Sequence, residues 1–130
     1  MKTIHVAAAI IQDGDRFLAA QRGYGDFKGG WEFPGGKLEP NEAADAACIR
    51  EIQEELNVTV TDLKFLCTAE HDYDAFHLSM DCYLCRIDQG VIEDHEHEEL
   101  RWFTIDEIWR IDWLPADIQV AEALEKASRG

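Results

Sequence analysis

Residues 42–56 restrict the fold of this chain most strongly, because a clear helix signal coincides there with a row of acidic side chains. No Gly or Pro interrupts the stretch, and it contains four alanines, the residue with the highest helix propensity. Pro40 and Asn41 come directly before it, and Asn is a favoured N-cap because its side chain accepts a hydrogen bond from a first-turn amide. The sequence therefore predicts a helix over 42–56 with Asn41 as its N-cap.

The predicted helix has two different faces. At 3.6 residues per turn, one sector is apolar and consists of Ile49, Ile52 and Leu56. A second sector, about 130° away, carries the carboxylates of Glu51, Glu54 and Glu55. Like charges at this spacing repel, and a bound divalent cation would convert the repulsion into coordination. Oxygen ligands suit Mg²⁺ or Mn²⁺ rather than zinc, and the alternative is a solvated acidic face without a ligand.

The spacing of these carboxylates belongs to a longer pattern. Gly36 is followed by Glu42 and then by the run Arg50-Glu51-Ile52-x-Glu54-Glu55-x-Asn57-Val58. This pattern resembles the Nudix box, which runs Gly, Glu, Arg-Glu-apolar-x-Glu-Glu, Gly, apolar. The one departure is Asn57, which stands where the family has Gly. We expect a left-handed backbone at this position after the helix, and Asn tolerates that conformation next best after Gly.

The resemblance implies both a fold and a reaction. The fold is α/β, the Nudix fold, an α/β/α sandwich with a mixed β-sheet and a catalytic loop-helix-loop, formed here by a single domain over residues 1–130. The implied reaction is Mg²⁺-dependent hydrolysis of a nucleoside triphosphate to the monophosphate and pyrophosphate. Segments at 31–37, 95–103 and 114–118 are similar to the MutT-type branch, and within it to bacterial enzymes that cleave cytidine nucleotides.

Hydrolysis of a phosphoanhydride requires a divalent ion, a positioned water and stabilisation of charge on the transferred group. We expect Glu54 and Glu55 to be the principal metal ligands, and Glu51 to be a ligand or the catalytic base. Arg50 is within reach to orient a catalytic carboxylate, or else forms only an ion pair with Glu54 one turn later. By analogy with the family, the carbonyl of Gly35 is a further ligand.

A second acidic segment follows much later in the chain. Glu96 precedes Trp102 by six residues, where MutT-type proteins place a loop glutamate that completes the metal site or activates water. Glu98 is the alternative for this role, and the register to Trp102 favours Glu96. His95 and His97 flank Glu96 and admit a transition-metal site, although histidines in an acidic loop are more often solvated.

Substrate contacts are expected on both sides of the box. Arg22 and Lys37 flank the glycine-rich approach and are the best candidates for phosphate contact, with surface solubility as the alternative role. Candidates for stacking on the base are Phe33, Tyr73, Phe76 and Trp113, with packing in the core or at the rim as the alternative for each.

Asp117 lies at the start of the last predicted helix, where the default role of Asp is N-cap. In the enzymes that the chain resembles, this position reads the edge of the base. An ionised carboxylate accepts a hydrogen bond from the cytosine amino group, whereas guanine O6 requires a donor. The expected substrates are therefore cytidine nucleotides, namely CTP, dCTP or 5-methyl-dCTP. A protonated Asp117 would instead pair with an oxidised purine, which leaves 8-oxo-dGTP open.

Charge and hydropathy exclude several classes of function. The net charge of −15 leaves no basic stripe for a nucleic-acid polymer, so the expected partner is a small nucleotide. The N-terminus lacks a signal peptide, and no stretch has the ~18 apolar residues of a membrane span, so a cytoplasmic monomer or homodimer is expected. A different diphosphate substrate and a non-catalytic ligand-sensing role are the alternatives, although sensing modules of the family typically lose box glutamates.

The other elements are predicted from turn residues and alternating apolar patterns. We expect a hairpin over 5–12 and 16–21, a loop over 22–30, and a short strand at 31–33. Further strands are expected at 59–66, 67–71, 76–87 and 100–103, with 76–87 the longest and central. A capping box at 104–107 opens a short helix. A last helix begins at Pro115 or Ala116, and its expected buried stripe is Ile118, Ala121, Leu124 and Glu125.

The chain contains a C-x-x-C sequence at Cys82 and Cys85. It falls within an expected strand, where residues three apart point to opposite faces of the sheet, and no second pair completes a zinc site. We therefore expect these cysteines to be buried apolar residues rather than a redox or metal pair.

Overall fold

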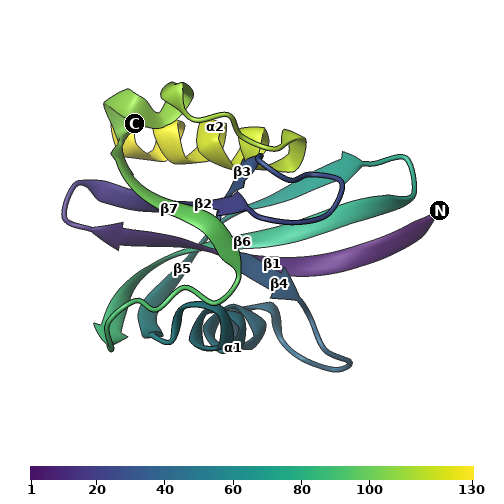
Figure 1. The fold of residues 1–130 in the computed structure, drawn as a ribbon, viewed down its shortest axis with the longest axis horizontal. Helices are drawn as coiled ribbons and strands as arrows, with labels where there is room; N and C mark the ends of the chain where they lie inside the picture. The colour runs from purple at the N-terminus through teal and green to yellow at the C-terminus, as the bar shows by residue number, and fades with distance from the viewer.

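The computed structural model describes all residues from Met1 to Gly130 and has three layers (Figure 1). A seven-stranded sheet forms the middle layer. Helix α1 (Ala44–Leu56) covers one face of the sheet, and helix α2 (Pro115–Arg129) covers the other together with the 3-10 helix η1 (Ile105–Arg110). The predicted α/β/α sandwich is therefore confirmed.

The sheet is mixed, as predicted. Its main path runs β3-β2-β1-β6-β5, with β4 paired to β1 and β7 paired to β2. Strands β1 and β6 are parallel, and every other strand pairing is antiparallel. The strands are β1 (Lys2–Asp13), β2 (Arg16–Arg22), β3 (Trp31–Glu32), β4 (Gly35–Lys37), β5 (Thr59–Asp72), β6 (Phe76–Gln89) and β7 (His97–Thr104).

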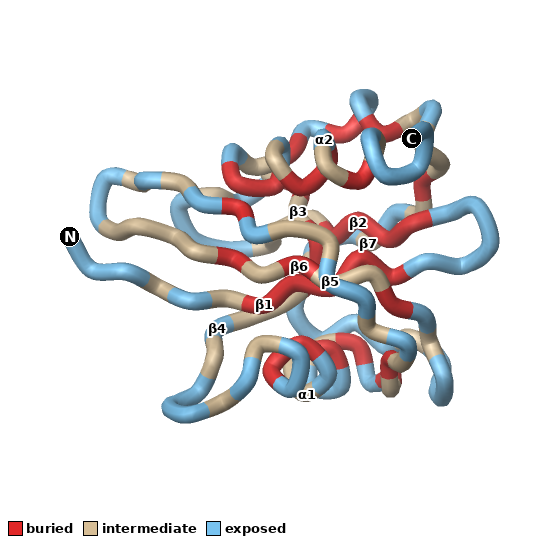
Figure 2. Tube along the Cα trace, turned by 180° about the vertical axis from the view of Figure 1, so that it is seen from behind, coloured by how far each residue is buried: buried red, intermediate tan, exposed pale blue.

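Each face of the sheet has its own apolar core. Consecutive residues of β1 alternate between the two cores: Ala7, Ala9 and Ile11 pack toward α1, whereas Ala8 and Ile10 pack toward α2. Because both faces are covered, the strand has a continuous apolar sequence instead of an alternating one. Buried residues, red in Figure 2, accordingly gather along the middle of the strands and on the inner sides of the helices.

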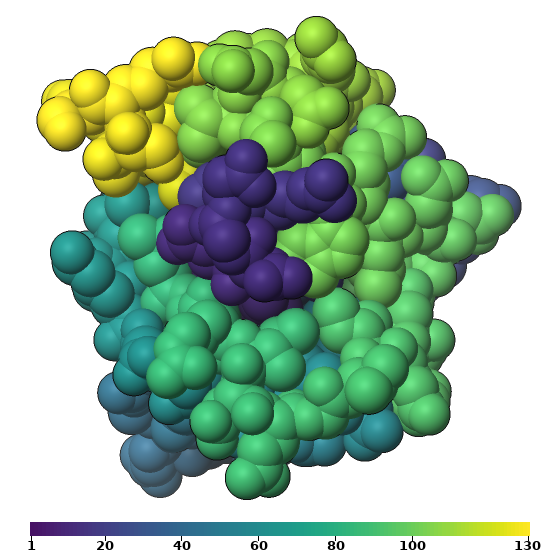
Figure 3. All heavy atoms as spheres, turned by 90° about the vertical axis from the view of Figure 1, so that its left-hand side faces the viewer, coloured from purple at the N-terminus to yellow at the C-terminus, as the bar shows by residue number.

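The predicted hairpin is confirmed by β1 and β2, which pair at Gln12 with Phe17 and at Asp13 with Arg16. Gly14 in the turn has φ +62°, a left-handed conformation that Gly adopts without steric cost. Figure 3 views the molecule from this end and shows the purple hairpin turn between the yellow C-terminal helix and the green residues at the end of β6. The β5–β6 turn lies at the other end of the sheet (Figure 1).

Strand β5 differs from the prediction of two strands at 59–66 and 67–71, because it is continuous from Thr59 to Asp72. Its pairing with β6 has register shifts between Thr61 and Lys64 and between Phe65 and Cys67. A bulge reverses which face the following side chains point to, so the alternating pattern breaks and suggests two strands. Strand β6 lies between β1 and β5 and is thus interior, as predicted, although both β5 and β6 have 14 residues.

The two ends of α1 agree with the prediction to different degrees. The N-cap is Ala43, and Asn41 adopts a left-handed backbone (φ 64°) in the turn before it, so the prediction of Asn41 as N-cap is wrong. This turn is closed instead by the Glu42 carboxylate, which accepts a hydrogen bond from the amide of Glu39 at 2.9 Å. At the other end, Asn57 has φ 58° and ψ 32°, which confirms the left-handed position where the Nudix pattern has Gly.

The buried stripes of both helices are rotated relative to the prediction. Two predicted apolar positions are substantially exposed, Ile49 at 38% and Ile118 at 42%. Helix α1 buries Ala47, Cys48, Ile52 and Leu56, and helix α2 buries Ala116, Asp117, Val120, Ala121 and Leu124. Several of the buried positions carry small residues, which an apolar pattern read from side-chain size underweights.

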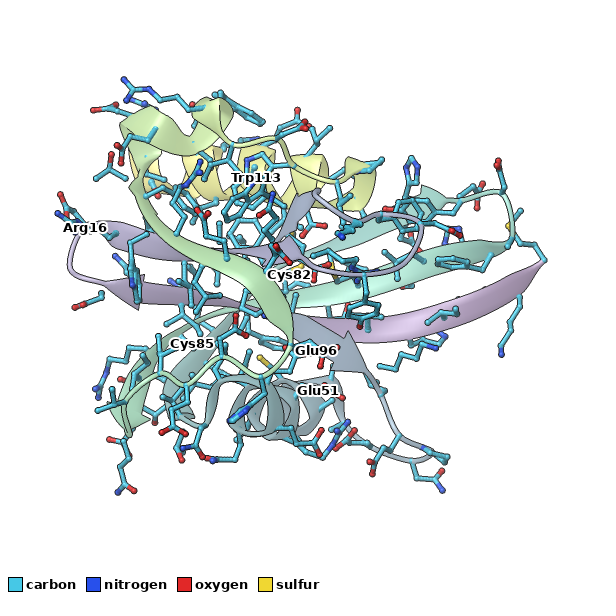
Figure 4. The ribbon with its side chains drawn as sticks, in the orientation of Figure 1. Arg16, Glu51, Cys82, Cys85, Glu96 and Trp113 are labelled. Carbon is cyan, nitrogen blue, oxygen red and sulfur yellow. The ribbon has the colours of Figure 1, made fainter.

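Two further predictions, the capping box at 104–107 and the burial of Cys82 and Cys85, are confirmed. Thr104 and Glu107 form the capping box of η1, with the Thr104 amide donating to the Glu107 carboxylate at 2.8 Å. Cys82 and Cys85 are buried on opposite sides of the sheet, in the core toward α2 and in the core toward α1 (Figure 4). None of the helices has both the length and the hydropathy required to span a membrane.

Candidate active site

A cavity of about 540 Å³ lies along the sheet where β4, α1, the segment before β7 and the start of α2 meet. One part of its wall is acidic and comes from α1 and residues 96–97, and another part is aromatic and comes from the β5–β6 turn and the 23–30 loop. Most predicted site residues line it: Arg22, Phe33, Gly35, Lys37, Glu51, Glu55, Phe76, Glu96 and Asp117. Arg50 and Glu54 are the predicted residues that do not.

Arg50 lies behind the cavity and organises the glutamates of the box. Its guanidinium donates to both carboxylate oxygens of Glu42 at 2.8 Å, to Glu51 at 2.9 Å and to Glu54 at 3.2 Å. A further hydrogen bond of 3.1 Å reaches the carbonyl of Lys37. The hydrogen bonds from Arg50 lower the pKa of Glu42 to about 2. Arg50 therefore orients Glu51 in addition to forming the ion pair with Glu54.

Glu51 lies directly against the backbone of β4. A Cβ atom at Gly36 would be 2.3 Å from the Glu51 carboxyl carbon, so no other residue at position 36 leaves room for this side chain. A Cβ atom at Gly35 would be 2.1 Å from the carbonyl oxygen of Ala7 in the neighbouring strand. The two glycines thus have different functions, since Gly35 allows β4 to approach β1 and Gly36 gives space to Glu51.

Glu55 is the most unusual carboxylate of the cavity. Its Oε2 atom is buried and has no hydrogen-bond partner. Burial raises the pKa of Glu55 to about 8 against the opposing charge of His97, and the neighbouring Glu51 and Glu96 raise it further. An unsatisfied buried carboxylate oxygen is costly in the protein alone, and coordination of a cation would satisfy it.

The donor set around Glu55 fits a hard divalent cation. Glu51, Glu55 and Glu96 offer only carboxylate oxygens and line the same cavity, and the charges of Glu51 and Glu96 both act on Glu55. Figure 4 labels Glu51 on α1 and Glu96 just before β7. In this structure, no three acidic or imidazole side chains are grouped closely enough to hold one metal ion. The carboxylates therefore line the same cavity without forming a complete coordination sphere. Glu54 points away from the cavity toward Arg50, and its role as a ligand stays a prediction.

The structure distinguishes Glu96 from Glu98, the two candidates for the loop glutamate that the sequence left open. Glu96 lines the cavity, whereas Glu98 does not and lies against Gly23 instead. His95 is exposed, and the side chain of His97 is only 3% exposed, with Nδ1 at 3.1 Å from Asp94. The two histidines therefore do not form a paired transition-metal site.

His97 lines the cavity, although from the sequence it was considered only as a candidate transition-metal ligand. Its Nε2 atom lies 3.6 Å from a carboxylate oxygen of Glu32. Burial lowers the pKa of His97, but the hydrogen bond that His97 donates to Glu32, the charge of Glu55 and the contact with Asp94 outweigh burial, and the net shift is upward. Glu32 and Tyr24 were also missed: Glu32 lies within the MutT-like segment 31–37 but was given no role, and Tyr24 lies in a loop outside the motifs.

At the other end of the cavity, Asp117 is buried and does not cap α2, whose N-cap is Leu114. Its Oδ1 atom accepts a hydrogen bond from the amide of Phe33 at 3.0 Å. Burial raises the pKa of Asp117 well above its ordinary value. The capping role that was the alternative for Asp117 is therefore wrong, and this polar side chain is held in an apolar environment beside the cavity.

The aromatic candidates fall into two groups. The Phe33 ring is 2% exposed and stacks on Trp113 with ring centroids 4.6 Å apart, so the core alternative holds for this ring. Phe76 is partly exposed, and its ring lies 5.2 Å from that of Tyr73, which in turn lies 4.9 Å from Phe27. Phe27, Tyr73 and Phe76 thus provide the aromatic surface of the cavity.

The two predicted cationic residues both reach the cavity. Arg22 donates to Glu32 at 2.9 Å, and its guanidinium carbon lies 5.9 Å from the centre of the Tyr24 ring. Lys37 is exposed at the end of β4. In a chain with a net charge of −15, these two side chains are the cations that line the cavity, and their contact with phosphate stays a prediction.

Comparison with known proteins agrees with the geometry. The NUDIX domain family matches residues 1–124. The chain is 35% identical over 124 residues to the CTP pyrophosphohydrolase of Escherichia coli, covering 95% of this chain and 92% of that protein. It is 42% identical over 85 residues to the 8-oxo-dGTP diphosphatase of Proteus vulgaris, covering 64% of this chain and 76% of that protein.

The fold also matches a solved structure. The crystal structure of the MutT NUDIX hydrolase from Burkholderia pseudomallei superposes with a TM-score of 0.83 at 27% identity, covering 95% of this chain and 98% of that one. The Nudix fold predicted from residues 36–58 and the MutT-like resemblance predicted from the segments 31–37, 95–103 and 114–118 are thereby confirmed. With its box helix, its carboxylate-lined cavity and a family match over nearly its full length, this chain belongs to the NUDIX family of hydrolases.

Proposed function

We propose that this protein is a Mg²⁺-dependent nucleoside triphosphate pyrophosphohydrolase that converts cytidine triphosphates to the monophosphate and pyrophosphate. The observation that carries the proposal is a single cavity with carboxylates at one end and a buried Asp117 beside aromatic rings at the other. This arrangement can hold the triphosphate at the acidic end through a cation and the base at the aromatic end. The similarity to the CTP pyrophosphohydrolase of Escherichia coli supports this assignment.

At the acidic end, Glu51, Glu55 and Glu96 would hold the divalent ion, with Glu54 and the Gly35 carbonyl as further predicted ligands. The bound ion would neutralise phosphate oxygens and lower the pKa of a coordinated water. Glu51 would be a metal ligand or the catalytic base. The hydrogen bond of 2.9 Å from Arg50 orients its carboxylate. Mn²⁺ has the same preference for oxygen ligands and would serve as a substitute.

Arg22 and Lys37 are proposed to contact the phosphates between the two ends. The cavity contains more acidic than basic side chains, so a triphosphate depends on the cation and on these two residues for charge balance. Arg22 is already oriented by Glu32 at 2.9 Å, which reduces the conformational freedom that binding would otherwise remove.

At the other end, Asp117 is proposed to read the base. Its Oδ1 atom is engaged by the Phe33 amide, which leaves Oδ2 for a substrate. The ionised form would accept a hydrogen bond from the cytosine amino group. Phe76 and Tyr73 are the exposed rings on which the base would stack.

A second candidate substrate is 8-oxo-dGTP, and one observation favours it. Burial raises the pKa of Asp117, and a protonated carboxyl would donate a hydrogen bond to a purine oxygen instead of accepting one from cytosine. The similarity to the 8-oxo-dGTP diphosphatase of Proteus vulgaris supports the same alternative.

A substrate panel distinguishes these candidates. Pyrophosphate release with Mg²⁺, and separately with Mn²⁺, is measured for CTP, dCTP, 5-methyl-dCTP, 8-oxo-dGTP and dGTP, with ADP-ribose and a diadenosine polyphosphate as other diphosphates. A maximum of kcat/KM for a cytidine nucleotide supports the proposal. Dominance of 8-oxo-dGTP transfers the assignment to the second candidate, and the absence of hydrolysis throughout the panel contradicts both.

The substitution Asp117→Asn tests the reading of the base. The Asn carbonyl can keep the hydrogen bond from the Phe33 amide, but its NH₂ group donates where the carboxylate accepts. We expect kcat/KM for CTP to fall by roughly 10-fold or more relative to a guanosine substrate, the size of one lost base contact. Thermal unfolding serves as the control for folding. An unchanged ratio between the two substrates would remove Asp117 from base recognition.

A further inference from the structure

The Glu96 carboxylate has a single hydrogen-bonded side-chain partner. The hydroxyl of Tyr24 donates to its Oε1 atom at 2.6 Å, a length typical of a hydrogen bond from a hydroxyl to an ionised carboxylate. Glu96 is otherwise exposed, and its backbone amide donates to Asp94 at 3.1 Å. Asp94 therefore determines the position of the Glu96 backbone, and Tyr24 determines where its carboxylate points.

The sheet brings these two residues together at its edge. Strands β2 and β7 pair antiparallel as far as Arg22 and His97, with a register shift between Gln21 and Arg22. Tyr24 follows Arg22, and Glu96 directly precedes His97, so the two side chains meet just beyond the end of the ladder. The Arg22 guanidinium lies 5.9 Å from the centre of the Tyr24 ring and gives the ring a second contact.

The loop that carries Tyr24, residues 23–30, is closed by its own backbone hydrogen bonds. The amide of Arg22 donates to the carbonyl of Gly30 at 2.9 Å, and the amide of Gly29 donates to the carbonyl of Arg22 at 2.8 Å. Gly25 and Gly29 have φ of +77° and +91°, conformations that only glycine adopts readily. The loop is thus a compact turn that presents Tyr24 from a defined position.

The same loop is anchored at the aromatic end of the cavity. The Phe27 ring lies 4.9 Å from that of Tyr73, and Gly30 packs so tightly that a Cβ atom there would be 2.2 Å from the Leu114 side chain. These contacts restrain the part of the loop that follows Tyr24, and the pairing of Arg22 with β7 restrains the chain just before it. Because the loop fixes the position of the Tyr24 hydroxyl, the hydrogen bond restricts the rotamers of the Glu96 side chain and does not simply follow its motion.

We propose that Tyr24 is a positioning residue of the metal site, which acts by holding the Glu96 carboxylate in the direction required to bind the cation. The inference deepens the proposed function, since it assumes that Glu96 contributes to cation binding. Tyr24 is not itself a ligand in this proposal. Without its hydroxyl, the exposed Glu96 side chain samples several rotamers, and binding of the cation must then select one of them.

The substitution Tyr24→Phe tests this proposal, because it removes the hydroxyl and keeps the ring that contacts Arg22. We expect the Kd for Mn²⁺ in the absence of nucleotide to rise roughly 5-fold to 10-fold, as for binding that must order one additional side chain. We expect kcat to fall by a similar factor while KM changes little. Electron paramagnetic resonance of free Mn²⁺ measures the Kd without requiring any hydrolysis.

The Glu96→Ala background shows whether Tyr24 acts through Glu96. There, the additional substitution Tyr24→Phe is expected to change the Mn²⁺ affinity by less than about 2-fold, because the acceptor is already absent. Tyr73→Phe is the matched control, since Tyr73 also lines the cavity but its hydroxyl lies 3.4 Å from the amide of Ala116 and touches no carboxylate. This control is expected to keep the Mn²⁺ affinity of the unaltered protein.

The outcomes separate this inference from the proposed function. Unchanged Mn²⁺ affinity in Tyr24→Phe overturns the positioning role, and so does a loss of affinity that persists at full size in the Glu96→Ala background. If the unaltered protein hydrolyses no nucleotide of the panel, the proposed function fails, while the Mn²⁺ measurements still decide whether Tyr24 positions Glu96.

Discussion

Glu55→Gln is expected to reduce hydrolysis by at least ~10²-fold and, at the same time, to stabilise the metal-free protein at pH 8. The Oε2 atom of Glu55 is buried and has no hydrogen-bond partner, and this desolvation raises the pKa of Glu55 from 4.5 to about 8. Gln has a similar shape and stays neutral, so it removes a proposed metal ligand and also removes a buried group that ionises. The opposite signs of the two effects distinguish a functional carboxylate from a structural one.

The pH dependence follows from the direction of the Glu55 pKa shift. Because the folded protein binds this proton more tightly than the unfolded chain does, the associated stability is fully present below pH 4.5 and is lost as the pH rises through about 8. Asp117 and His97 also have raised pKa values and contribute in the same direction. The Tm of the metal-free protein is therefore expected to fall between pH 5 and pH 9, with a smaller fall in Glu55→Gln.

Thermal unfolding in the presence of a chelator, followed across this pH range, measures the effect. Glu54→Gln is the matched control for stability, since the Glu54 side chain is 58% exposed and paired with Arg50. It should leave the pH dependence of Tm unchanged. A Glu55→Gln protein with the same pH dependence as the unaltered chain would contradict the assignment of the raised pKa to Glu55.

Gly36→Ala is expected to lower kcat by roughly 10²-fold while the protein still unfolds cooperatively. A Cβ atom at this position would be 2.3 Å from the carboxyl carbon of Glu51, and the far end of this side chain can move. Glu51 would then leave its position beside Arg50, with which it forms a hydrogen bond of 2.9 Å. Because the backbone is not displaced, activity is lost and the fold is retained.

Gly35→Ala provides the contrast, since its Cβ atom would be 2.1 Å from the Ala7 carbonyl oxygen and 2.7 Å from the Ala8 Cα atom. Backbone atoms of β1 cannot yield as a side chain does, so we expect this variant to lose a few kcal/mol of stability. Steady-state kinetics and denaturant unfolding of both variants make the comparison. A fully active Gly36→Ala enzyme would show that hydrolysis does not require the Glu51 carboxylate in its present position beside Gly36.

Local signals in the sequence were sufficient for the box. The alanines and the absence of Gly and Pro predicted α1, and the position of Asn57 predicted a left-handed residue that the structure has at φ 58°. These features depend on neighbours within one or two helical turns, where propensity and hydrogen bonding within the backbone dominate. The spacing of Gly36, Glu42 and the run 50–58 also identified the family, through its resemblance to the Nudix box.

Features that depend on contacts between distant parts of the chain were predicted less well than the box. The break in β5 was a set of bulges against β6, and the predicted cap at Asn41 was replaced by a hydrogen bond between Glu42 and Glu39. The buried face of α2 was also missed, because it is set by contacts with distant segments, such as the hydrogen bond from the Phe33 amide to Asp117. A pattern of apolar residues does not contain this information.

By itself, the sequence determined the box helix, the family and which side chains could serve as ligands or base readers, because these follow from residue type and local spacing. Only the tertiary structure decided that Asp117 is buried against Phe33, that Arg50 holds Glu51 as well as Glu54, and that Tyr24 holds Glu96. These contacts fix how far a polar side chain is buried or which way it points. Both properties depend on how the three layers pack, which local sequence does not specify.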